Sequence, residues 1–393
     1  MMEDVVIVSA VRTPIGKFGG SFKNIFAVDL GVIVTKEAVK RAGLSPDEVD
    51  YVIFGNVLQA GLGQNPARQI SVHAGIPFHV PAMTINEVCG SGLKSIILGM
   101  QSIQLGQADV VVAGGTENMS QAPYLVPNLR WGGKMGDSPM IDSMVHDGLT
   151  DAFEHIHMGV TAEKVAMEYG VSRKEQDLFA LQSQQKASRA QKSGKFSEEI
   201  VPVKIKDKKG EKEIVEDEFI RHDASMEGFQ KLRPAFVENG TVTAGNSSGL
   251  NDGAACVVLM KKSLADERKI PYFGVIKGYS EVGSAPTIMG YTPYFSIKKL
   301  LEKTGLTASE IDLFEINEAF ASQSIAVVRD LGLDPEKVNV NGGAIALGHP
   351  IGASGARILV TLLHEMKRSK SKKGIASLCV GGGIGISLLV EHI

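Results

Sequence analysis

The sequence is poor in residues that could cross-link the chain. Its 393 residues contain three cysteines, at positions 89, 256 and 379, and one tryptophan. So few and so scattered cysteines exclude a disulfide framework or a cysteine-rich zinc site. No HExxH or CxxC spacing occurs either, so we expect no bound metal. An odd number of cysteines directs attention to individual reactive thiols instead.

An excess of one charge is also lacking, and so are long hydrophobic runs. The chain has 41 basic and 44 acidic residues, a net charge of −3, which is unlike the basic surface of a nucleic-acid-binding protein. No run of 18 apolar residues occurs, so no transmembrane helix is expected. Residues 5–8 resemble a buried strand rather than part of a signal peptide, and the last residues match no peroxisomal or ER-retention signal. We therefore expect a cytoplasmic protein with neither nucleic acid nor membrane as partner.

An internal repeat is the strongest organisational feature of the chain. Residues 43–50 are GLSPDEVD and residues 305–312 are GLTASEID, and an apolar, strand-like run follows each segment. A second pair of similar segments, 108–115 and 375–382, leads from apolar residues into paired glycines. Repeats in the same order predict two similar halves of alternating strands and helices, and hence a layered α/β fold.

The repeat also predicts domain boundaries. Residues 1–120 and 250–270 are expected to form the N-terminal half, and residues 271–393 the C-terminal half. Residues 121–249, which hold the only tryptophan and much of the charge, are expected to form an inserted loop domain. Within it, Ser172 and Glu175 have the spacing of a capping box that opens a helix extending to about residue 191.

Cys89 stands at a predicted strand-to-helix turn. Residues 83–88 are strand-like, and the apolar positions of residues 93–103 recur at helical spacing. The Cys-Gly-Ser-Gly segment between them places the thiol at the N-terminus of the helix, where unpaired N–H groups and the helix dipole favour a thiolate. A buried structural cysteine would not need three small neighbours, so we expect Cys89 to be a nucleophile.

A nucleophilic thiol needs a base, and a second glycine-rich turn supplies the candidate. His349 lies in residues 341–355, NGGAIALGHPIGASG, which the repeat pairs with the Cys89 turn. Two further predicted strands end in Cys379 and Asn317. We expect them beside the same crevice, as an acid/base and as a group that holds water or stabilises an oxyanion. Cys256 has only apolar neighbours and is expected to be inert.

Five segments together resemble one known family. They are VCGSG at 88–92, GNSSG at 245–249, NEAF at 317–320, GHP at 348–350 and CVGGG at 379–383. Over essentially its whole length the chain resembles the thiolases, most closely the short-chain acetyl-CoA acetyltransferases. The resemblance implies the thiolase fold, with five layers α-β-α-β-α formed by two duplicated βαβαβαββ halves and an inserted loop domain.

The resemblance also implies a reversible condensation of two acetyl-CoA molecules to acetoacetyl-CoA and CoA. His349 would take the proton of Cys89, which would carry the acetyl group, and Cys379 would deprotonate the second acetyl-CoA. One oxyanion hole would use His349 and a water held by Asn317, and the other the N–H groups of Cys89 and Gly381. CoA is then both substrate and product, and no separate cofactor is expected.

The same resemblance implies which residues surround the substrate. Arg221 would lie near the nucleotide end of CoA, and the remaining CoA contacts would be Ser248, Ala244, Phe236, Leu149 and His157. The acyl pocket would be bordered by Met158, Met289 and Phe320, whose bulk leaves room for little more than an acetyl or acetoacetyl unit. Residues 128–135 resemble the family's tetramer-forming loop, so a homotetramer is expected.

Three other functions are compatible with parts of this pattern. A degradative 3-ketoacyl-CoA thiolase of broader chain length would share the catalytic residues. A decarboxylating ketoacyl synthase usually pairs its cysteine with two histidines, whereas Asn317 takes the place of the second histidine. A non-catalytic acyl-CoA-binding protein would not need Cys89, His349 and Cys379 together. If both thiols contact one substrate carbon, oxidation could join them in a disulfide, although a reducing cytosol favours the free thiols.

Overall fold

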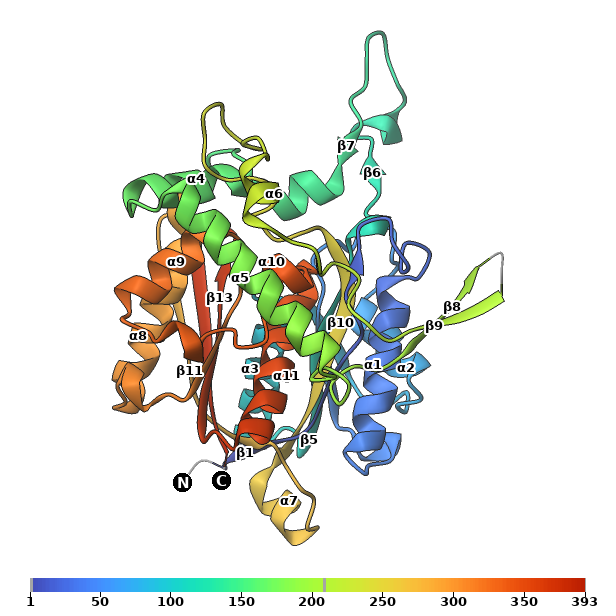
Figure 1. Ribbon diagram of the computed structural model, residues 1–393. Helices are drawn as coiled ribbons and strands as arrows, with labels where there is room; N and C mark the ends of the chain where they lie inside the picture. Colours follow the sequence, from blue (N-terminus) through green and yellow to red (C-terminus); the bar gives the residue numbers. More distant parts are fainter. Residues whose placement is uncertain (1–2, 208–209, 393) are drawn as a thin grey trace.

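The computed structural model describes residues 3–207 and 210–392 (Figure 1). Across these residues the main sheet has ten strands in the order β12-β13-β14-β11-β1-β10-β5-β3-β4, with the short β2 paired to β10. The first side of this sheet consists of β1 (Val5–Arg12), β2 (Gly16–Lys17), β3 (Tyr51–Gly55), β4 (Ala82–Ile85), β5 (Val110–Asn118) and β10 (Asn251–Lys261). The second side consists of β11 (Gly274–Gly283), β12 (Leu313–Ile316), β13 (Lys373–Val380) and β14 (Ile384–Glu391). The two sides meet at β1 and β11.

Helices lie between the two sides of the sheet and on both outer faces. The central helices α3 (Ser91–Gln104) and α11 (Ile351–Ser369) share one apolar core with strands of both sides. The first side is covered by α1 (Ala27–Arg41) and α2 (Pro66–His73), and the second by α8 (Thr292–Thr304) and α9 (Ala321–Asp330). Figure 1 shows the resulting order of layers, helix, strand, helix, strand, helix. This is the layered arrangement that the sequence predicted.

The two sides share a local plan that explains the repeat. The 3-10 turns η1 (Pro46–Glu48) and η6 (Ala308–Glu310) each begin with a capping box. The Asp50 carboxylate then accepts hydrogen bonds from the N–H groups of residues 109 and 110, at 2.8 and 2.9 Å. The Asp312 carboxylate accepts the equivalent bonds from residues 372 and 373, also at 2.8 and 2.9 Å. The matching sequences therefore tie the start of one strand to the start of the next.

The register of the second repeat segment differs from the prediction. Parallel pairing places Tyr51 opposite Val111, and the equivalent Leu313 opposite Gly374. Equivalent positions on β5 and β13 are therefore 374 − 111 = 263 residues apart. The prediction matched residues 108–115 with 375–382, a separation of 267, and was wrong by four residues. The glycines had misaligned the strands, since those of the first segment lie within β5 whereas those of the second follow β13.

Two glycines let the central helices approach closely. A Cβ atom at Gly92 would lie 2.6 Å from the backbone nitrogen of Ala356, and one at Gly355 would lie 2.3 Å from that of Leu93. No other residue type could occupy either position without moving a helix. The crossing brings the N-termini of α3 and α11 together, and with them the turns that carry Cys89 and His349.

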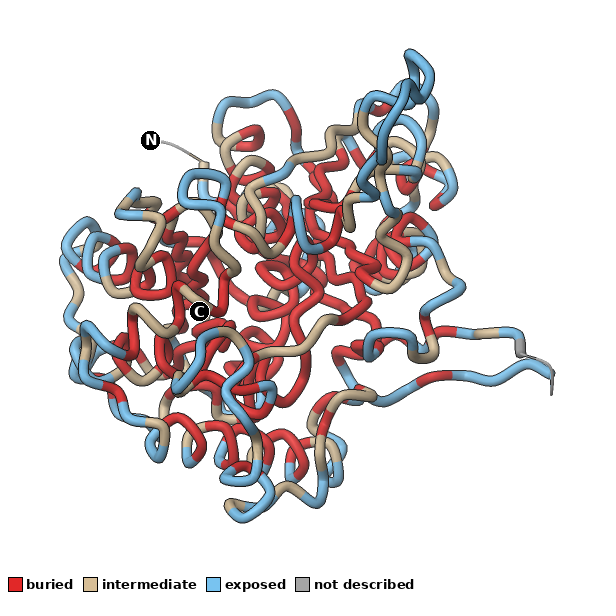
Figure 2. The backbone as a smooth tube through the Cα atoms, turned by 90° about the horizontal axis from the view of Figure 1, so that it is seen from above, coloured by how far each residue is buried: buried red, intermediate tan, exposed pale blue. Residues whose placement is uncertain are grey.

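Residues between β5 and β10 form a long excursion from the sheet. It contains β6 (Tyr124–Leu125), β7 (Ile141–Asp142), the π-helix η4 (Met144–Leu149), α4 (Met158–Glu168), α5 (Arg173–Lys192), β8 (Val203–Asp207), β9 (Gly210–Ile214) and α6 (Met226–Gln230). The capping box predicted at the start of α5 is confirmed, because Ser172 and Glu175 bond reciprocally. Figure 2 shows the β8–β9 hairpin and the loop between β6 and β7 as exposed arms on a buried body. The predicted domain boundaries themselves stay a prediction.

The remaining helices are short. They comprise α7 (Lys262–Glu267), α10 (Ala344–Leu347) and the 3-10 turns η2 (Met119–Gln121), η3 (Leu129–Trp131), η5 (Pro286–Tyr291) and η7 (Pro335–Lys337). In the described ranges, no helix combines the length and apolar character needed to cross a membrane.

Candidate active site

Cys89 lies in the turn between β4 and α3, where the sequence predicted a strand-to-helix turn. Gly90 is the N-cap of α3, and Cys89 directly precedes it. Val88 has a φ of 42°, a left-handed conformation that costs a β-branched residue about 1–3 kcal/mol. The Ser91 hydroxyl secures this turn by accepting from the Glu87 N–H at 2.8 Å and donating to the Val88 carbonyl at 2.7 Å. Backbone strain of this kind is typical of functional sites.

His349 is fixed at the N-terminus of α11 with one ring nitrogen free. Nδ1 lies 2.6 Å from the Ser354 hydroxyl and 3.5 Å from Nδ2 of Asn317. Because Ser354 donates its own proton to the Pro350 carbonyl at 2.9 Å, the short contact requires Nδ1 to be the donor. Nε2 then carries the lone pair, and it has no hydrogen-bond partner among the described residues. The geometry leaves a buried base ready to accept a proton.

Cys379, Gly381 and Asn317 lie beside this pair at the ends of β13 and β12. The Cys379 thiol is 1% exposed and donates a long hydrogen bond of 3.6 Å to Oε1 of Gln323. The N–H groups of Gly381 and of Cys89 itself both point at the Cys89 sulfur. Asn317 is fully buried, and its Oδ1 has no partner in the described part of the chain. The five predicted catalytic residues are therefore brought together.

Burial keeps the reactive groups neutral before substrate binds. It raises the pKa of the Cys89 thiol to about 11, against the opposing effect of the Gly381 and Cys89 N–H groups. Burial, aided by the nearby charge of Arg357, lowers the pKa of His349 to about 3. The N–H groups favour the thiolate in the expected direction, but desolvation outweighs them. Burial and the adjacent Cys89 raise the pKa of Cys379 far above its usual range.

A cavity of about 460 Å³ opens in front of Cys89 and His349. Eleven of the fourteen residues predicted to bind or transform substrate line it: Cys89, His349, Leu149, His157, Met158, Arg221, Phe236, Ala244, Ser248, Met289 and Phe320. Asn317, Cys379 and Gly381 are not among the lining residues. The position of the cavity, between the central helices and the excursion that contains α4 and α6, fits a substrate that reaches the thiol from the surface.

Apolar side chains form the part of the cavity lining that lies near Cys379. Met158, Met289 and Phe320 form one buried cluster with Cys379. The Phe236 ring stacks on His157 at 4.8 Å and meets Phe320 edge to face at 6.1 Å. These side chains therefore lie next to Cys379 and line the same cavity as Cys89.

Arg221 is the one charged residue among those that line the cavity. Its guanidinium is 5.6 Å from the Phe219 ring and 3.5 Å from the Ala244 carbonyl. Neither contact neutralises its charge, so the side chain is available to an anionic group.

Several residues that shape the site were not identified from the sequence. Ser354 orients the imidazole, Asn251 accepts a hydrogen bond from the His349 N–H at 2.9 Å, and Gln323 contacts the second thiol. Glu117 accepts bonds from the N–H groups of residues 57, 58 and 352 and so links the loop after β3 to the N-terminus of α11. Ser354 could have been found, since it falls within the glycine-rich segment of His349. The others come from distant segments that only the fold brings together.

The described residues contain no group of three histidine, cysteine, aspartate or glutamate side chains that could hold a metal ion. Cys89, Cys256 and Cys379 are all free thiols. Cys256 lies in the apolar core of the first side, fully buried, and has no place in the cavity.

Comparison with known proteins agrees with this site. The family model for the thiolase N-terminal domain matches residues 5–263, and that for the thiolase C-terminal domain matches residues 270–392. The chain therefore belongs to the thiolase family and is an acyltransferase with the thiolase fold.

Relatives of known name match over the full length. An acetyl-CoA acetyltransferase of Cupriavidus necator is 56% identical over 392 residues and all of both chains. A probable acetyl-CoA acyltransferase of Staphylococcus aureus is 56% identical over 99% of each chain. Among solved structures, the Bacillus anthracis acetyl-CoA acetyltransferase has a TM-score of 0.98 at 48% identity, covering 100% of this chain and 99% of that one. Human mitochondrial 3-ketoacyl-CoA thiolase has a TM-score of 0.97 at 44% identity, with the same coverage.

Proposed function

We propose that the protein is an acetyl-CoA C-acetyltransferase, which reversibly condenses two acetyl-CoA molecules to acetoacetyl-CoA and CoA. The observation that carries the proposal is the grouping of two thiols and an unpartnered imidazole nitrogen at one cavity, which Cys89 and His349 line. The full-length relatives named acetyl-CoA acetyltransferase support the same activity. Arg221 in the cavity lining suits the phosphates of CoA.

The first half-reaction forms an acetyl-enzyme. His349 Nε2 takes the Cys89 proton as the sulfur attacks the thioester carbon of acetyl-CoA, so a thiolate forms only as the new bond does. The attack makes the thioester oxygen of acetyl-CoA anionic, and the N–H groups of Cys89 and Gly381 stabilise this oxyanion. The carbon–sulfur bond to CoA then breaks, and the leaving CoA thiolate takes the proton of Cys379. Cys89 is left acetylated, and Cys379 is left as a thiolate.

The second half-reaction forms the carbon–carbon bond. The Cys379 thiolate removes a proton from the methyl group of a second acetyl-CoA, whose thioester oxygen becomes anionic beside His349 and a water held by Asn317. The resulting carbanion attacks the acetyl carbon on Cys89. The Cys89 sulfur leaves and recovers its proton from His349, and acetoacetyl-CoA is released. Thiols and imidazole supply every proton transfer, so we propose that no cofactor besides CoA takes part.

Substrate length distinguishes this function from that of a broader 3-ketoacyl-CoA thiolase. Met158, Met289 and Phe320 support the short-chain assignment, because each would have to move for a longer acyl chain. The test is thiolysis by CoA of acetoacetyl-CoA and of a long-chain 3-ketoacyl-CoA. Cleavage of acetoacetyl-CoA alone is expected. Comparable cleavage of both substrates would assign the broader activity. If the Cys89→Ala variant still cleaved its substrate at the wild-type rate, the mechanism would be overturned.

We further propose that the protein acts as a homotetramer in the cytoplasm. Trp131 and Met135 are 84% and 104% exposed on the loop between β6 and β7, and contact with a second copy would cover them. Three free thiols suit a reducing compartment. Light scattering of the wild type and of Trp131→Ser tests the assembly. A tetramer that is unchanged by the substitution would show that this loop does not hold it together.

A further inference from the structure

Gln323 has one amide atom that contacts a reacting group and one that contacts nothing. The side chain belongs to α9 and is fully buried. Its Oε1 accepts a hydrogen bond from the Cys379 thiol at 3.6 Å, while its Nε2 has no partner in the described part of the chain. A buried donor without an acceptor is costly and is rare in folded proteins. This cost indicates that Nε2 finds an acceptor at another stage of the reaction.

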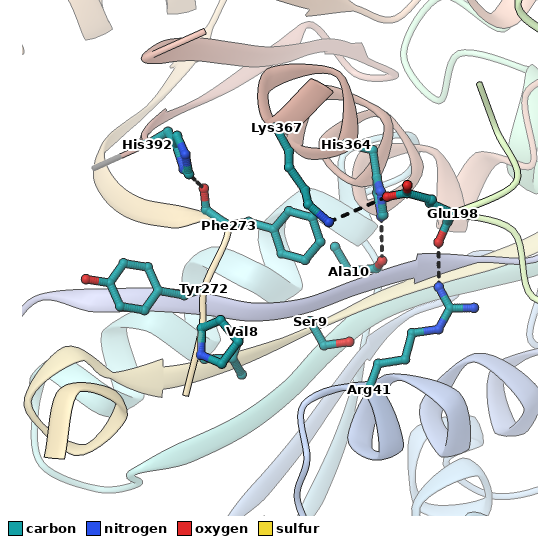
Figure 3. Close-up of a pocket in the computed structure, with 11 residues that line it drawn as sticks. Val8, Ser9, Ala10, Arg41, Glu198, Tyr272, Phe273, His364, Lys367 and His392 are labelled. Carbon is teal, nitrogen blue, oxygen red and sulfur yellow. Dashed lines mark hydrogen bonds and ion pairs between the residues drawn. The ribbon is translucent and has the colours of Figure 1, made fainter. Parts of the chain in front are cut away.

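A second unpartnered side chain lies far from the reacting groups. His364 is 13 residues into α11, about 20 Å along the helix from its catalytic end, and lines a cavity of about 500 Å³ (Figure 3). The cations at this cavity, Lys367 and Arg41, both contact Glu198. The cavity shares no lining residue with the catalytic one. Gln323 differs from His364 because its partner is a thiol that transfers protons in the proposed reaction.

Packing fixes the aliphatic stem of Gln323 but not the orientation of its amide. A Cβ atom at Gly290, in η5, would lie 2.8 Å from Cβ of Gln323 and 3.2 Å from its Cγ, so glycine is needed there to leave room for the stem. The last bond of a glutamine side chain has a broad, roughly two-fold torsion, so a half-turn exchanges Oε1 and Nε2. Because Gln323 does not line the catalytic cavity, this turn would not displace a bound substrate.

The proposed reaction uses Cys379 in two protonation states with opposite hydrogen-bonding needs. The thiol donates to Oε1 of Gln323, whereas a thiolate can only accept. Burial and the adjacent Cys89 oppose the thiolate, as the raised pKa of Cys379 shows, and the N–H of Cys379 itself favours it. A second donor at the sulfur would make the thiolate easier to form, and Nε2 of Gln323 is one half-turn away.

We propose that Gln323 holds Cys379 in both protonation states by turning its carboxamide, with Oε1 on the thiol and Nε2 on the thiolate. This inference rests on the proposed function, in which Cys379 gives its proton to the CoA sulfur and later takes one from the methyl group of acetyl-CoA. No bond to Gln323 forms or breaks in either transfer. Gln323 therefore acts through Cys379, as a positioning residue. The turn also gives Nε2 the acceptor that it lacks beside the thiol.

Condensation of acetyl-CoA by the full-length Gln323→Met variant tests the proposal. Methionine has a similar length and fills the same space without an amide. Because a hydrogen bond to a charged group contributes more than a neutral one, kcat should fall about 10- to 100-fold. KM should stay within about twofold of wild type, since Gln323 does not line the cavity.

Acetylation of Cys89 by 4-nitrophenyl acetate separates this role from a structural one. The nitrophenolate leaves without a proton, so this step does not need Cys379. Its rate in Gln323→Met, followed by the absorbance of nitrophenolate, should stay within about twofold of wild type. An equal loss in acetylation and condensation would assign Gln323 a structural role only and overturn the proposal. So would condensation by Gln323→Met within about twofold of wild type.

Ser324→Ala is the matched control on the same helix. Ser324 is buried beside Gln323 in sequence and donates within α9 to the Phe320 carbonyl at 3.2 Å, so its loss should leave both rates within about twofold of wild type. If Gln323→Met does not fold, Gln323→Asn gives the same comparison, because its amide ends one methylene short of the sulfur. Wild-type protein that does not condense acetyl-CoA would overturn the proposed function, and this inference with it, whereas the results above concern Gln323 alone.

Discussion

Equivalent strands on the two sides of the sheet have very different residues at or near their ends. On the first side β3 ends in Gly55, where a Cβ atom would lie 2.6 Å from Ser91, so a side chain there has no space. Its equivalent on the second side is Asn317, whose Nδ2 lies 3.5 Å from the ring of His349. The same contrast holds on the next strand, where Thr116 corresponds to Cys379.

The Thr116 hydroxyl makes a short hydrogen bond within the structure, whereas the Cys379 thiol makes only a long one. The Thr116 hydroxyl donates to the Ala27 carbonyl at 2.5 Å, deep in the core of the first side. The Cys379 thiol has only a long contact of 3.6 Å and lies among the side chains that border the cavity. One copy of the repeat thus uses these positions to hold helices in place, and the other copy leaves them free for chemistry. Both copies of the repeat therefore have the same strands and helices, but only the second copy has reactive groups, Asn317 and Cys379, at these two positions.

The largest expected effect is on the rate of thiolysis, and it distinguishes Cys379 from its equivalent residue Thr116. Cys379→Ala should lower thiolysis about 10³- to 10⁴-fold, because the acid that protonates the carbanion is gone, while stability changes little. Thr116→Val should leave thiolysis within about twofold and lower the free energy of unfolding by about 1 kcal/mol through loss of one hydrogen bond. Thiolysis rates and urea denaturation of both variants provide the measurement. Comparable loss of activity in the two would remove the distinction between a structural and a reactive copy.

A smaller effect is expected at Asn317. Asn317→Ala should lower the rate of carbon–carbon bond cleavage about 10²- to 10³-fold, as removal of one group from an oxyanion site commonly does. Formation of acetyl-Cys89 from acetyl-CoA uses the other oxyanion site and should stay within about threefold of wild type. Rapid-mixing measurement of each half-reaction tests this division. If both half-reactions slow equally, Asn317 orients His349 rather than holding a water for one step.

The pH dependence of acetyl-enzyme formation should be nearly flat on the acid side. An ordinary histidine, with a pKa near 6.5, would be about 90% protonated at pH 5.5 and would lose about tenfold in rate as a base. Because burial lowers the pKa of His349 to about 3, the imidazole stays neutral there, and a change below about twofold is expected between pH 7.5 and pH 5.5. Single-turnover acetylation of Cys89 measures this. A rate that falls along a titration curve centred near 6.5 would show that the site is wetter than the structure indicates.

The lowered pKa of His349 also makes the folded protein less stable at acidic pH. His349 has a lower pKa in the folded state than in the unfolded chain, so the unfolded state binds the proton more readily. Its contribution to the free energy of unfolding is therefore complete above pH 6.5 and is lost as the pH falls from about 6.5 toward 3.

Local patterns were sufficient to predict the elements that carry the site, but not the contacts between them. The spacing of apolar residues predicted α3, and the Ser172–Glu175 spacing predicted the start of α5. Each of these signals is contained within a short stretch of sequence, so it can be recognised without the rest of the fold. The second repeat segment was aligned wrongly because glycine pairs resemble each other in sequence while they occupy different positions on β5 and β13. The neutral state of Cys89 was also missed, since it depends on burial by several distant segments rather than on its own helix.

The smallest expected effect tests whether the shared frame is equally strong in both copies. Asp50 and Asp312 each accept two backbone N–H bonds at the start of the following strand, at nearly identical distances. Asp50→Ala and Asp312→Ala should each lower the free energy of unfolding by about 1–2 kcal/mol, because two N–H groups lose their acceptor at partly solvated positions. Asp47→Ala, which removes an exposed carboxylate from the neighbouring turn, should change it by less than about 0.5 kcal/mol. Urea denaturation gives all three values, and thiolysis should be unchanged in each variant. A difference above about 1 kcal/mol between the two aspartates would mean that the copies have diverged in their frame as well as at their strand ends.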